Sequence, residues 1–228
     1  MLSVICPIYN EAKYIDVCVQ SILLQDYPKQ QLEVLFVDGM SKDGTRDIVN
    51  NYSKQYPFIR LLNNEKRIVP VAMNIGIKAS IGDIVMRLDA HAQYPPNYFS
   101  VLVKELVRLR ADNVGVACKT DVLNKTSKTL AIREVLSNRF GVGNSTFRLG
   151  VDKVIEVDTV PFGCWKKDVF NKYGFYDERL IRNQDIELNK RIVRGGGHIF
   201  IVPDTYCTYL ARETFDGLAK NNFGKDRK

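Results

Sequence analysis

Short apolar runs alternate with amphipathic stretches through the first half of the chain. The stretch 12–24 shows the second kind, because its apolar residues recur at helical spacing. Near-continuous apolar runs separated by helices are typical of buried parallel strands in a sheet that is covered on both faces. The pattern predicts strands at 2–6, 32–37, 58–62, 83–88 and 114–117, and helices at 12–24, 43–56, 69–78 and 96–110.

The regular alternation of apolar runs and amphipathic stretches does not continue in the second half of the chain. Residues 123–150 are polar and dotted with glycine, and one helix is expected at 129–140. Beyond them the pattern predicts strands at 153–157, 160–165, 198–202 and 205–210, a helical turn at 168–173 and a helix at 183–194. We therefore predict an α/β fold with a Rossmann-like, doubly wound, mostly parallel central sheet and an antiparallel C-terminal extension.

The composition is that of a globular protein with a basic charge. Hydrophobic residues make up 45% and charged residues 26% of the chain, which excludes a disordered or fibrous protein. The net charge of +7 is compatible with nucleic acid, a nucleotide or an acidic membrane face as partner. Several of the five cysteines lie in apolar runs, and no apolar run is long enough to span a membrane. We therefore expect reduced thiols and a cytoplasmic protein.

Ligands of doubly wound sheets bind beyond the carboxyl ends of the strands, so the loops there are the first candidates for chemistry. After the first strand, Tyr9 offers a planar ring for stacking on a base, although a plain strand exit followed by a helix cap fits equally well. After the second strand, Asp38 can accept a hydrogen bond from a ribose hydroxyl or a base N–H. The sequence contains neither G-x-G-x-x-G after the first strand nor G-x-x-x-x-G-K-[ST], which disfavours a dinucleotide site and a P-loop ATPase.

The fourth predicted strand is followed by Asp89 and His91, whose side chains point the same way because they are two residues apart. A carboxylate and an imidazole at that spacing can share one divalent cation, Mg²⁺ or Mn²⁺, and the cation would neutralise a diphosphate leaving group. The alternative is a turn aspartate beside a hydrogen-bonded histidine, and the short pattern alone favours that alternative.

Two later segments supply candidates for an acceptor side. Asp185 lies at the start of a predicted helix, where it is either a carboxylate that favours the helix end or a general base for an attacking hydroxyl. Upstream of it, Gly163 leaves space, and Trp165 offers a flat face on which a sugar can stack. A core position for Trp165 is an equal alternative.

Five motifs together resemble the inverting glycosyltransferase family 2, which has the GT-A fold. Within that family the chain looks most like the bacterial succinoglycan-type exopolysaccharide glucosyltransferases. The motifs are CPIYNE (6–11), VDGMSKDGT (37–45), AMNIGIKASIGDIVMRLDAHAQYPPNY (72–98), VDTVPFGCWKKDVF (157–170) and RNQDIELNKRIVRGGG (182–197). Each motif is modest alone, but all five occur in the family's order and cover nearly the whole chain.

The resemblance implies a donor site, a metal site and an acceptor site. The residues that would bind the UDP-sugar are Pro7, Tyr9, Glu11, Asp38, Arg67 and Asp89. Asp89 and His91 would occupy the family's D-x-D position and hold Mg²⁺ or Mn²⁺, and Asp185 would be the catalytic base. The residues that would contact the acceptor are Gly163, Cys164, Trp165 and Gln184.

Three departures from the family pattern concern specificity. His91 replaces the usual second aspartate, so the family pattern does not decide which metal this site prefers. Gly39 stands where many relatives carry a second acidic residue, which bears on recognition of the base. The Q-x-x-R-W motif of processive synthases does not occur, which argues against processive synthesis.

The resemblance also implies a domain plan and a reaction. Residues 1–210 would form the catalytic domain, with 1–118 binding the nucleotide-sugar and 119–210 binding the acceptor. Residues 211–228 would be a C-terminal helix and basic tail that leads toward a membrane region. The reaction would move a hexose, glucose, from a UDP-sugar to a hydroxyl of a glycan or lipid-linked saccharide in cell-surface polysaccharide synthesis. We expect this at the cytoplasmic face of the bacterial inner membrane, with peripheral membrane contact and no nucleic acid.

Two other functions compete with this hypothesis. A sugar-phosphate nucleotidyltransferase shares the α/β layout, but it usually has a glycine-rich basic first loop, which CPIYNE does not resemble. A non-catalytic module that binds nucleic acid or an anionic surface would use the positive charge, but the basic residues are scattered along the chain.

Overall fold

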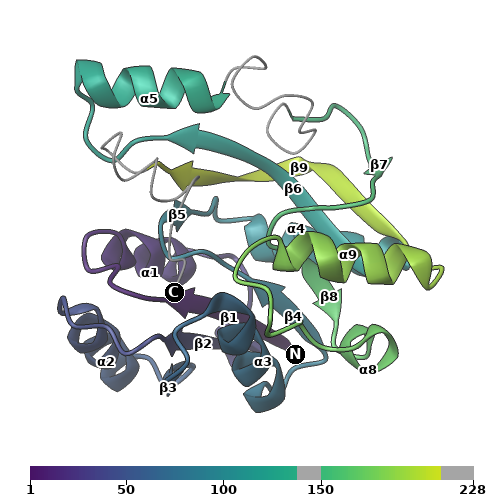
Figure 1. Cartoon of the computed structure of the whole chain (residues 1–228), viewed down its shortest axis with the longest axis horizontal. Helices are drawn as coiled ribbons and strands as arrows, with labels where there is room; N and C mark the ends of the chain where they lie inside the picture. The colour runs from purple at the N-terminus through teal and green to yellow at the C-terminus, as the bar shows by residue number, and fades with distance from the viewer. Residues whose placement is uncertain (138–149, 212–228) are drawn as a thin grey trace.

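A computed structural model of the chain describes residues 1–137 and 150–211. Within them, nine strands form a single sheet, which Figure 1 shows running through the whole molecule. The order across the sheet is β3-β2-β1-β4-β8-β6-β9-β5, and β7 pairs with β9 off this path. The strands are β1 (Leu2–Ile8), β2 (Leu32–Asp38), β3 (Ile59–Asn63), β4 (Ile84–Arg87), β5 (Ala92–Gln93), β6 (Asn113–Asp121), β7 (Ile155–Glu156), β8 (Cys164–Lys166) and β9 (Ile199–Leu210).

The sheet is mostly parallel, as the sequence predicted. The pairs β1–β2, β1–β4 and β2–β3 are parallel. β8 runs antiparallel to both β4 and β6, and β5 and β7 run antiparallel to β9. β6 and β9, in contrast, pair in parallel over most of their length. The reversed strands are therefore β5, β7 and β8, and the other six strands run in one direction.

Helices cover both faces of the sheet. One face is covered by α1 (Ile15–Leu23), α2 (Thr45–Gln55) and α4 (Tyr98–Arg108), and the other by α3 (Val69–Ala79), α8 (Val169–Tyr173) and α9 (Gln184–Arg194). A short 3₁₀ turn, Lys29–Gln31, precedes β2. α5 (Ser127–Ser137) lies over β6 at the far side of the molecule, where Ile132 packs against Val122 in a small separate cluster (Figure 1).

Strand β1 shows why the central strands are largely apolar. Leu2, Val4 and Cys6 belong to the cluster beneath α1 and α4, whereas Ile5 belongs to the cluster beneath α3 and α9. The buried polar residue Ser3 has a partner, since its hydroxyl donates to Glu33 Oε1 on β2 at 2.5 Å. Successive side chains of a strand point to opposite faces, so a strand buried on both faces needs apolar residues at most positions. This double burial produces the continuous apolar runs from which the strands were predicted.

Two differences from the predicted elements have local causes. The two strands expected at 198–202 and 205–210 are one strand, β9, and the pairing with β6 shifts register between Val116 and Ala117. Pro203 lies in the three residues that this shift skips, and proline is tolerated at such a bulge because it has no N–H to donate. The strand expected at 160–165 begins only at Cys164, because Phe162 and Gly163 have φ angles of 62° and 102°. The end of the helix expected at 129–140 and nearly all of the tail at 211–228 lie outside the described residues.

Candidate active site

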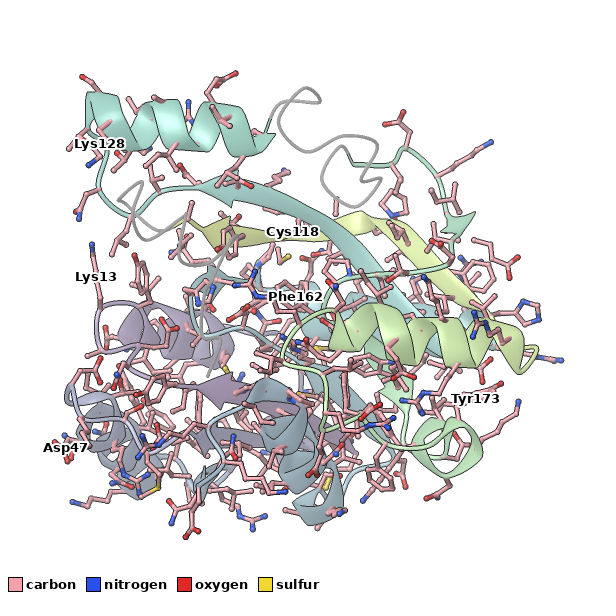
Figure 2. The ribbon with its side chains drawn as sticks, in the orientation of Figure 1. Lys13, Asp47, Cys118, Lys128, Phe162 and Tyr173 are labelled. Atoms are coloured by element: carbon pink, nitrogen blue, oxygen red, sulfur yellow. The ribbon has the colours of Figure 1, made fainter. Side chains whose placement is uncertain are left out.

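A cavity of about 390 Å³ opens at the carboxyl ends of β1, β2 and β4. Its walls come from the loops after these strands, from the loop after β3 and from the turn before β8. Cys118 on β6 and Phe162 also line it, and both are labelled near the centre of Figure 2. The polar residues that line the cavity are Tyr9, Glu11, Asn64, Arg67, Arg87, Asp89, His91 and Tyr209. Several of the residues predicted for donor binding are thus brought together, as the rule for doubly wound sheets requires.

Tyr9 forms an aromatic wall of the cavity. The side chain follows β1 and is 46% exposed, an uncommon state for a tyrosine beside a buried strand. Its ring lies close to Gly39, where an added Cβ would come within 3.1 Å of Tyr9 Cδ2. The missing side chain at Gly39 therefore leaves room for the ring beside the backbone. A flat, accessible ring of this kind can stack on a planar ligand.

Asp38, which the sequence analysis expected to contact the nucleoside, is not part of the cavity wall. Its side chain is fully buried, and the carboxylate accepts hydrogen bonds from Ser41 N at 3.0 Å and from Arg46 Nη1 at 2.5 Å. The Ser41 hydroxyl donates to the same carboxylate. Asp38 therefore fixes the turn that carries Gly39 and positions the site indirectly.

Asn64 lines the cavity and was missed by the sequence analysis. The residue is 2% exposed, its backbone N donates to Asp38 O at 2.8 Å, and its Nδ2 donates to Ile68 O at 3.0 Å. The buried Oδ1 has no hydrogen-bond partner among the described residues. A buried acceptor without a partner costs free energy, so its presence in a cavity wall points to a ligand that donates there. Arg67, as predicted, lines the same side of the cavity.

Glu11, Asp89 and His91 meet at the opposite side of the cavity. His91 Nδ1 lies 3.3 Å from Glu11 Oε1 and 3.3 Å from Asp89 Oδ1, although Glu11 comes from the loop after β1. The His91 ring packs edge-on against Tyr14 and Tyr209, with centroid distances of 6.2 and 5.1 Å. Two carboxylates and an imidazole therefore form one acidic pole.

Buried groups beneath this pole hold the Asp89 loop in place. Asp89 N donates to the Tyr94 hydroxyl at 2.7 Å, and the same hydroxyl donates to Asp89 O at 3.1 Å. Burial raises the pKa of Tyr94, so its hydroxyl stays protonated and can donate. Cys18 Sγ also donates to Asp89 O, at 3.6 Å. The position of the Asp89 backbone is thus set by the core.

The acidic pole suits a divalent cation that arrives together with phosphate. Among the described residues, no group of three or more histidine, cysteine, aspartate and glutamate side chains is arranged to hold a metal ion by itself. Asp89 and His91 can supply two ligands, and Mg²⁺ or Mn²⁺ commonly takes its remaining ligands from substrate phosphates and water. The residues present therefore fit a cation shared with a diphosphate.

Asp185 forms a second acidic group, joined to the cavity through Arg87. Arg87 Nη1 donates to both carboxylate oxygens of Asp185, at 2.5 and 2.6 Å, and the Tyr176 hydroxyl donates to Oδ1 at 3.2 Å. The Asp185 side chain keeps 19% of its surface exposed. Burial raises the pKa of Asp185 although Arg87 acts to lower it. Arg87 lines the cavity, whereas Asp185 lies behind it.

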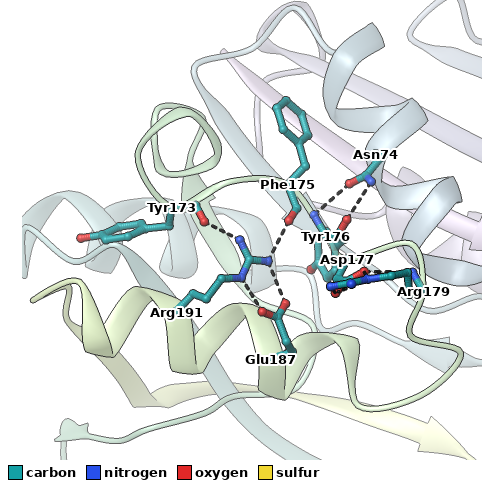
Figure 3. Close-up of polar contacts among 8 residues, drawn as sticks. All are labelled: Asn74, Tyr173, Phe175, Tyr176, Asp177, Arg179, Glu187 and Arg191. Carbon is teal, nitrogen blue, oxygen red and sulfur yellow. Dashed lines mark hydrogen bonds and ion pairs between the residues drawn. The ribbon is translucent and has the colours of Figure 1, made fainter.

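The loop before α9 is braced from two sides, as Figure 3 shows. Asn74 on α3 accepts from Tyr176 N at 3.0 Å and donates to Tyr176 O at 2.9 Å. Arg191 on α9 donates to Tyr173 O and to Phe175 O, while its guanidinium is paired with Glu187. These contacts fix Tyr176, and Tyr176 in turn holds Asp185.

The residues predicted to bind the acceptor do not line the cavity. Trp165 is 0% exposed and packs against Phe170 and Tyr176, with centroid distances of 5.7 and 6.4 Å. Cys164 is equally buried, and Gly163 has φ +102° with the Trp165 ring so close that an added Cβ would clash. Gln184 begins α9 outside the cavity wall. The core alternative for Trp165 is therefore correct, and Pro161 and Phe162 provide the wall on this side.

We expect Trp165→Ala to destabilise the fold rather than weaken acceptor binding alone. Removing a fully buried large aromatic side chain typically costs about 3–5 kcal/mol. Urea unfolding followed by circular dichroism measures this loss, with Trp165→Phe as the milder control. Wild-type stability combined with weakened acceptor binding in Trp165→Ala would restore the stacking role.

Comparison with known proteins decides the family. The family model for glycosyl transferase family 2 matches residues 3–174, three quarters of the chain. The chain belongs to glycosyltransferase family 2. The resemblance inferred from the five motifs and the predicted enzyme class, a glycosyltransferase, are thereby confirmed.

Curated members of the family match over almost the whole chain. The succinoglycan biosynthesis protein ExoA of Rhizobium meliloti is 29% identical over 98% of this chain and 67% of its own length. The dolichyl N-acetyl-alpha-D-glucosaminyl phosphate 3-beta-D-2,3-diacetamido-2,3-dideoxy-beta-D-glucuronosyltransferase of Methanococcus voltae is 28% identical over 96% of this chain and 70% of its own length. Both relatives are thus longer than this chain.

Solved structures confirm the GT-A fold. TarS from S. aureus, in complex with UDP-GlcNAc, superposes with a TM-score of 0.72 at 19% identity and covers 96% of this chain. The mannosyltransferase PcManGT from Pyrobaculum calidifontis, in complex with GDP-Man and Mn²⁺, superposes with a TM-score of 0.71 at 22% identity and covers 94% of this chain. This chain spans about three fifths of each of these structures, 60% and 58%. Within 1–137 and 150–211, none of the helices combines the length and apolar character needed to cross a membrane.

Proposed function

We propose that this family 2 enzyme is an inverting, metal-assisted hexosyltransferase that takes glucose from a UDP-sugar. The acceptor is a hydroxyl of a glycan or of a lipid-linked saccharide in cell-surface polysaccharide synthesis. The observation that carries the proposal is a cavity with Asp89 and His91 in its wall and a second carboxylate, Asp185, held directly behind the wall residue Arg87.

The donor end of the cavity suits a nucleoside diphosphate. Tyr9 supplies an exposed ring for the base, and the buried Asn64 Oδ1 supplies an acceptor for an N–H such as that of uracil. Arg67 and Arg87 add positive charge to the wall. Among the solved neighbours, TarS is in complex with UDP-GlcNAc, and GalNAc-T7 with UDP and Mn²⁺. These features favour a pyrimidine diphosphate sugar.

The residues divide the reaction between them. Asp185 accepts the proton of the acceptor hydroxyl, the oxygen attacks the anomeric carbon, and the bond from that carbon to the diphosphate oxygen breaks with its electron pair leaving on UDP. A single displacement from the opposite side inverts the anomeric centre. A cation held by Asp89 and His91 would neutralise the charge that develops on the diphosphate. The general base contributes about 10²–10⁴-fold.

The names of two relatives support the acceptor class. The Methanococcus voltae relative is named for a dolichyl sugar phosphate, a lipid-linked saccharide, and the Rhizobium meliloti relative for succinoglycan biosynthesis. We propose that this enzyme works at the cytoplasmic face of a membrane. The peripheral contact that we predict for the stretch 210–223 lies almost wholly outside the described residues.

Slow donor hydrolysis tests the proposed function. We expect the enzyme with Mn²⁺ to release glucose and UDP from UDP-glucose, and to form no UDP-glucose or pyrophosphate from UTP and glucose 1-phosphate. Asp168→Asn changes an exposed carboxylate at the N-terminal end of α8, and this control variant should behave like the wild type. Pyrophosphate release from UTP and glucose 1-phosphate would identify a nucleotidyltransferase instead. Salt-dependent oligonucleotide binding without hydrolysis would favour the anionic-surface alternative.

A further inference from the structure

We propose that Arg87 is a cation shared between the base and the donor: it pairs with Asp185 while the cavity is empty and moves to the diphosphate when the donor binds. The inference rests on the proposed function, because it takes a nucleoside diphosphate as the ligand and Asp185 as the base. It assigns to Arg87 a positioning role that couples the filling of the donor site to the release of the base.

The pairing with Asp185 does not use every donor of the guanidinium, although Arg87 also interacts with Tyr176. A single nitrogen, Nη1, serves both oxygens of Asp185, although a guanidinium carries five N–H donors. The Nε atom is buried and has no partner among the described residues. The guanidinium carbon also lies 5.6 Å from the centre of the Phe162 ring in the cavity wall. An arginine with a purely structural role would be expected to use all of its N–H donors in hydrogen bonds within the protein.

The position of Arg87 places it between the two acidic groups. It is the last residue of β4, two positions before Asp89, and it reaches Asp185 at the start of α9. Burial alone would lower the pKa of Arg87, but the carboxylates of Asp185 and Asp89 raise it, so the side chain stays charged. Residues that face Asp185 from the packed elements are Arg87 and Tyr176, with the charge of Asp89 acting from further away.

The chemistry of the reaction requires this pair to loosen. A carboxylate that is held at 2.5 Å by a guanidinium accepts a new proton poorly, because the ion pair stabilises its charged form. A diphosphate offers a higher charge and oxygens suited to arginine, so it competes for the guanidinium. Transfer of Arg87 to the diphosphate would then free Asp185 for the acceptor hydroxyl only when the donor is present.

A double-mutant cycle on nucleotide binding tests the proposal without measuring activity. The probe is UDP with Mn²⁺, titrated by calorimetry into the wild type, Arg87→Met, Asp185→Asn and the double variant. We expect Asp185→Asn to bind UDP about tenfold more tightly, because Arg87 no longer has a competing carboxylate. We expect Arg87→Met to bind about tenfold more weakly, and the double variant to bind no more tightly than Arg87→Met. Uridine, which lacks phosphate, should bind all four proteins alike.

Two controls separate this role from a general effect of charge and from misfolding of a variant. Lys190→Met removes an exposed charge from α9 and should leave UDP binding unchanged. A crystal structure of the wild type with UDP and Mn²⁺ covers the case in which a variant fails to fold. It should show Arg87 within hydrogen-bond distance of a diphosphate oxygen, with its contact to Asp185 lengthened or lost.

The outcomes distinguish the two proposals. If the wild type does not bind UDP, the proposed function fails, and the inference fails with it. If the wild type binds UDP but the two substitutions act additively, or the complex keeps the Arg87–Asp185 pair without a phosphate contact, the inference alone is overturned. Arg87 would then be a structural partner of Asp185, and the glycosyltransferase proposal would stand.

Discussion

Replacing Asp185 with asparagine is expected to abolish sugar transfer without weakening donor binding. Asparagine has nearly the same shape and can still accept from Arg87, so the packing around α9 should survive. It cannot take the proton from the acceptor hydroxyl, and the loss of a general base lowers the rate by about 10²–10⁴-fold. Radiolabelled transfer from UDP-glucose measures the effect, and UDP calorimetry confirms that the donor site is still formed.

The pH dependence gives a second readout of the same residue. Burial raises the pKa of Asp185 above its ordinary value of 3.8, and the residue acts as a base only when it is ionised. The transfer rate should therefore fall as the pH drops through this raised pKa, so the acidic limb should lie above the range of an exposed aspartate. Wild-type turnover by Asp185→Asn would remove Asp185 from the mechanism, whereas Asp168→Asn should retain both rate and pH profile.

Replacing Asp89 with alanine is expected to abolish the metal-dependent part of donor binding. Asp89 provides the carboxylate of the acidic pole, and His91 alone would leave a cation with a single side-chain ligand from this pair. Loss of an outer-shell partner already costs about 10–100-fold in metal affinity, so loss of a ligand should cost at least as much. Calorimetry of UDP with and without Mn²⁺ measures the difference between the two titrations.

A matched control for Asp89 lies on the same stretch of chain. Asp83 precedes β4, is exposed, and forms an ion pair with the amino terminus at 3.2 Å. Asp83→Ala should bind UDP and Mn²⁺ like the wild type, since exposed ion pairs contribute about 0–1 kcal/mol. An unchanged Mn²⁺ dependence in Asp89→Ala would show that the cation is held elsewhere.

The sequence predicted the donor end of the site because that end follows from strand periodicity. The buried strands are mostly apolar, and their carboxyl ends must lie at one edge of a parallel sheet. Tyr9 and Asp89 follow such strands, Glu11 was assigned by the family resemblance, and the structure places all three in the cavity wall. Local pattern and fold class were sufficient for Tyr9 and Asp89, whereas Glu11 needed the resemblance.

The errors concern where side chains point after a turn or across the sheet. Asp38 also follows a buried strand, but Ser41 and Arg46 turn its carboxylate inward. Trp165 pairs with Val85 on the central strand β4, and its buried ring packs against Phe170 and Tyr176. Neither partner can be recognised from spacing, because tryptophan and aspartate occur in binding sites and in interiors alike.

The sequence also contained an indication of the ion pair that the prediction did not use, namely the position of Arg87. It is the charged residue that ends an apolar strand, and a charge buried there requires an opposite charge. The sequence could have indicated that a partner exists. It could not have named Asp185, which lies 98 residues further along the chain.

The sequence by itself determined the alternation of buried strands and helices, the family, and the edge of the sheet at which ligands bind. Only the tertiary structure decided that His91 meets Glu11, that Asn64 presents a buried acceptor, and that Arg87 holds Asp185. The physical reason is that periodicity reports which face of an element is buried. The pairing of two charges from distant segments depends on how those segments pack together. The loops that carry Asn64 and His91 have no periodic pattern from which their positions could be predicted.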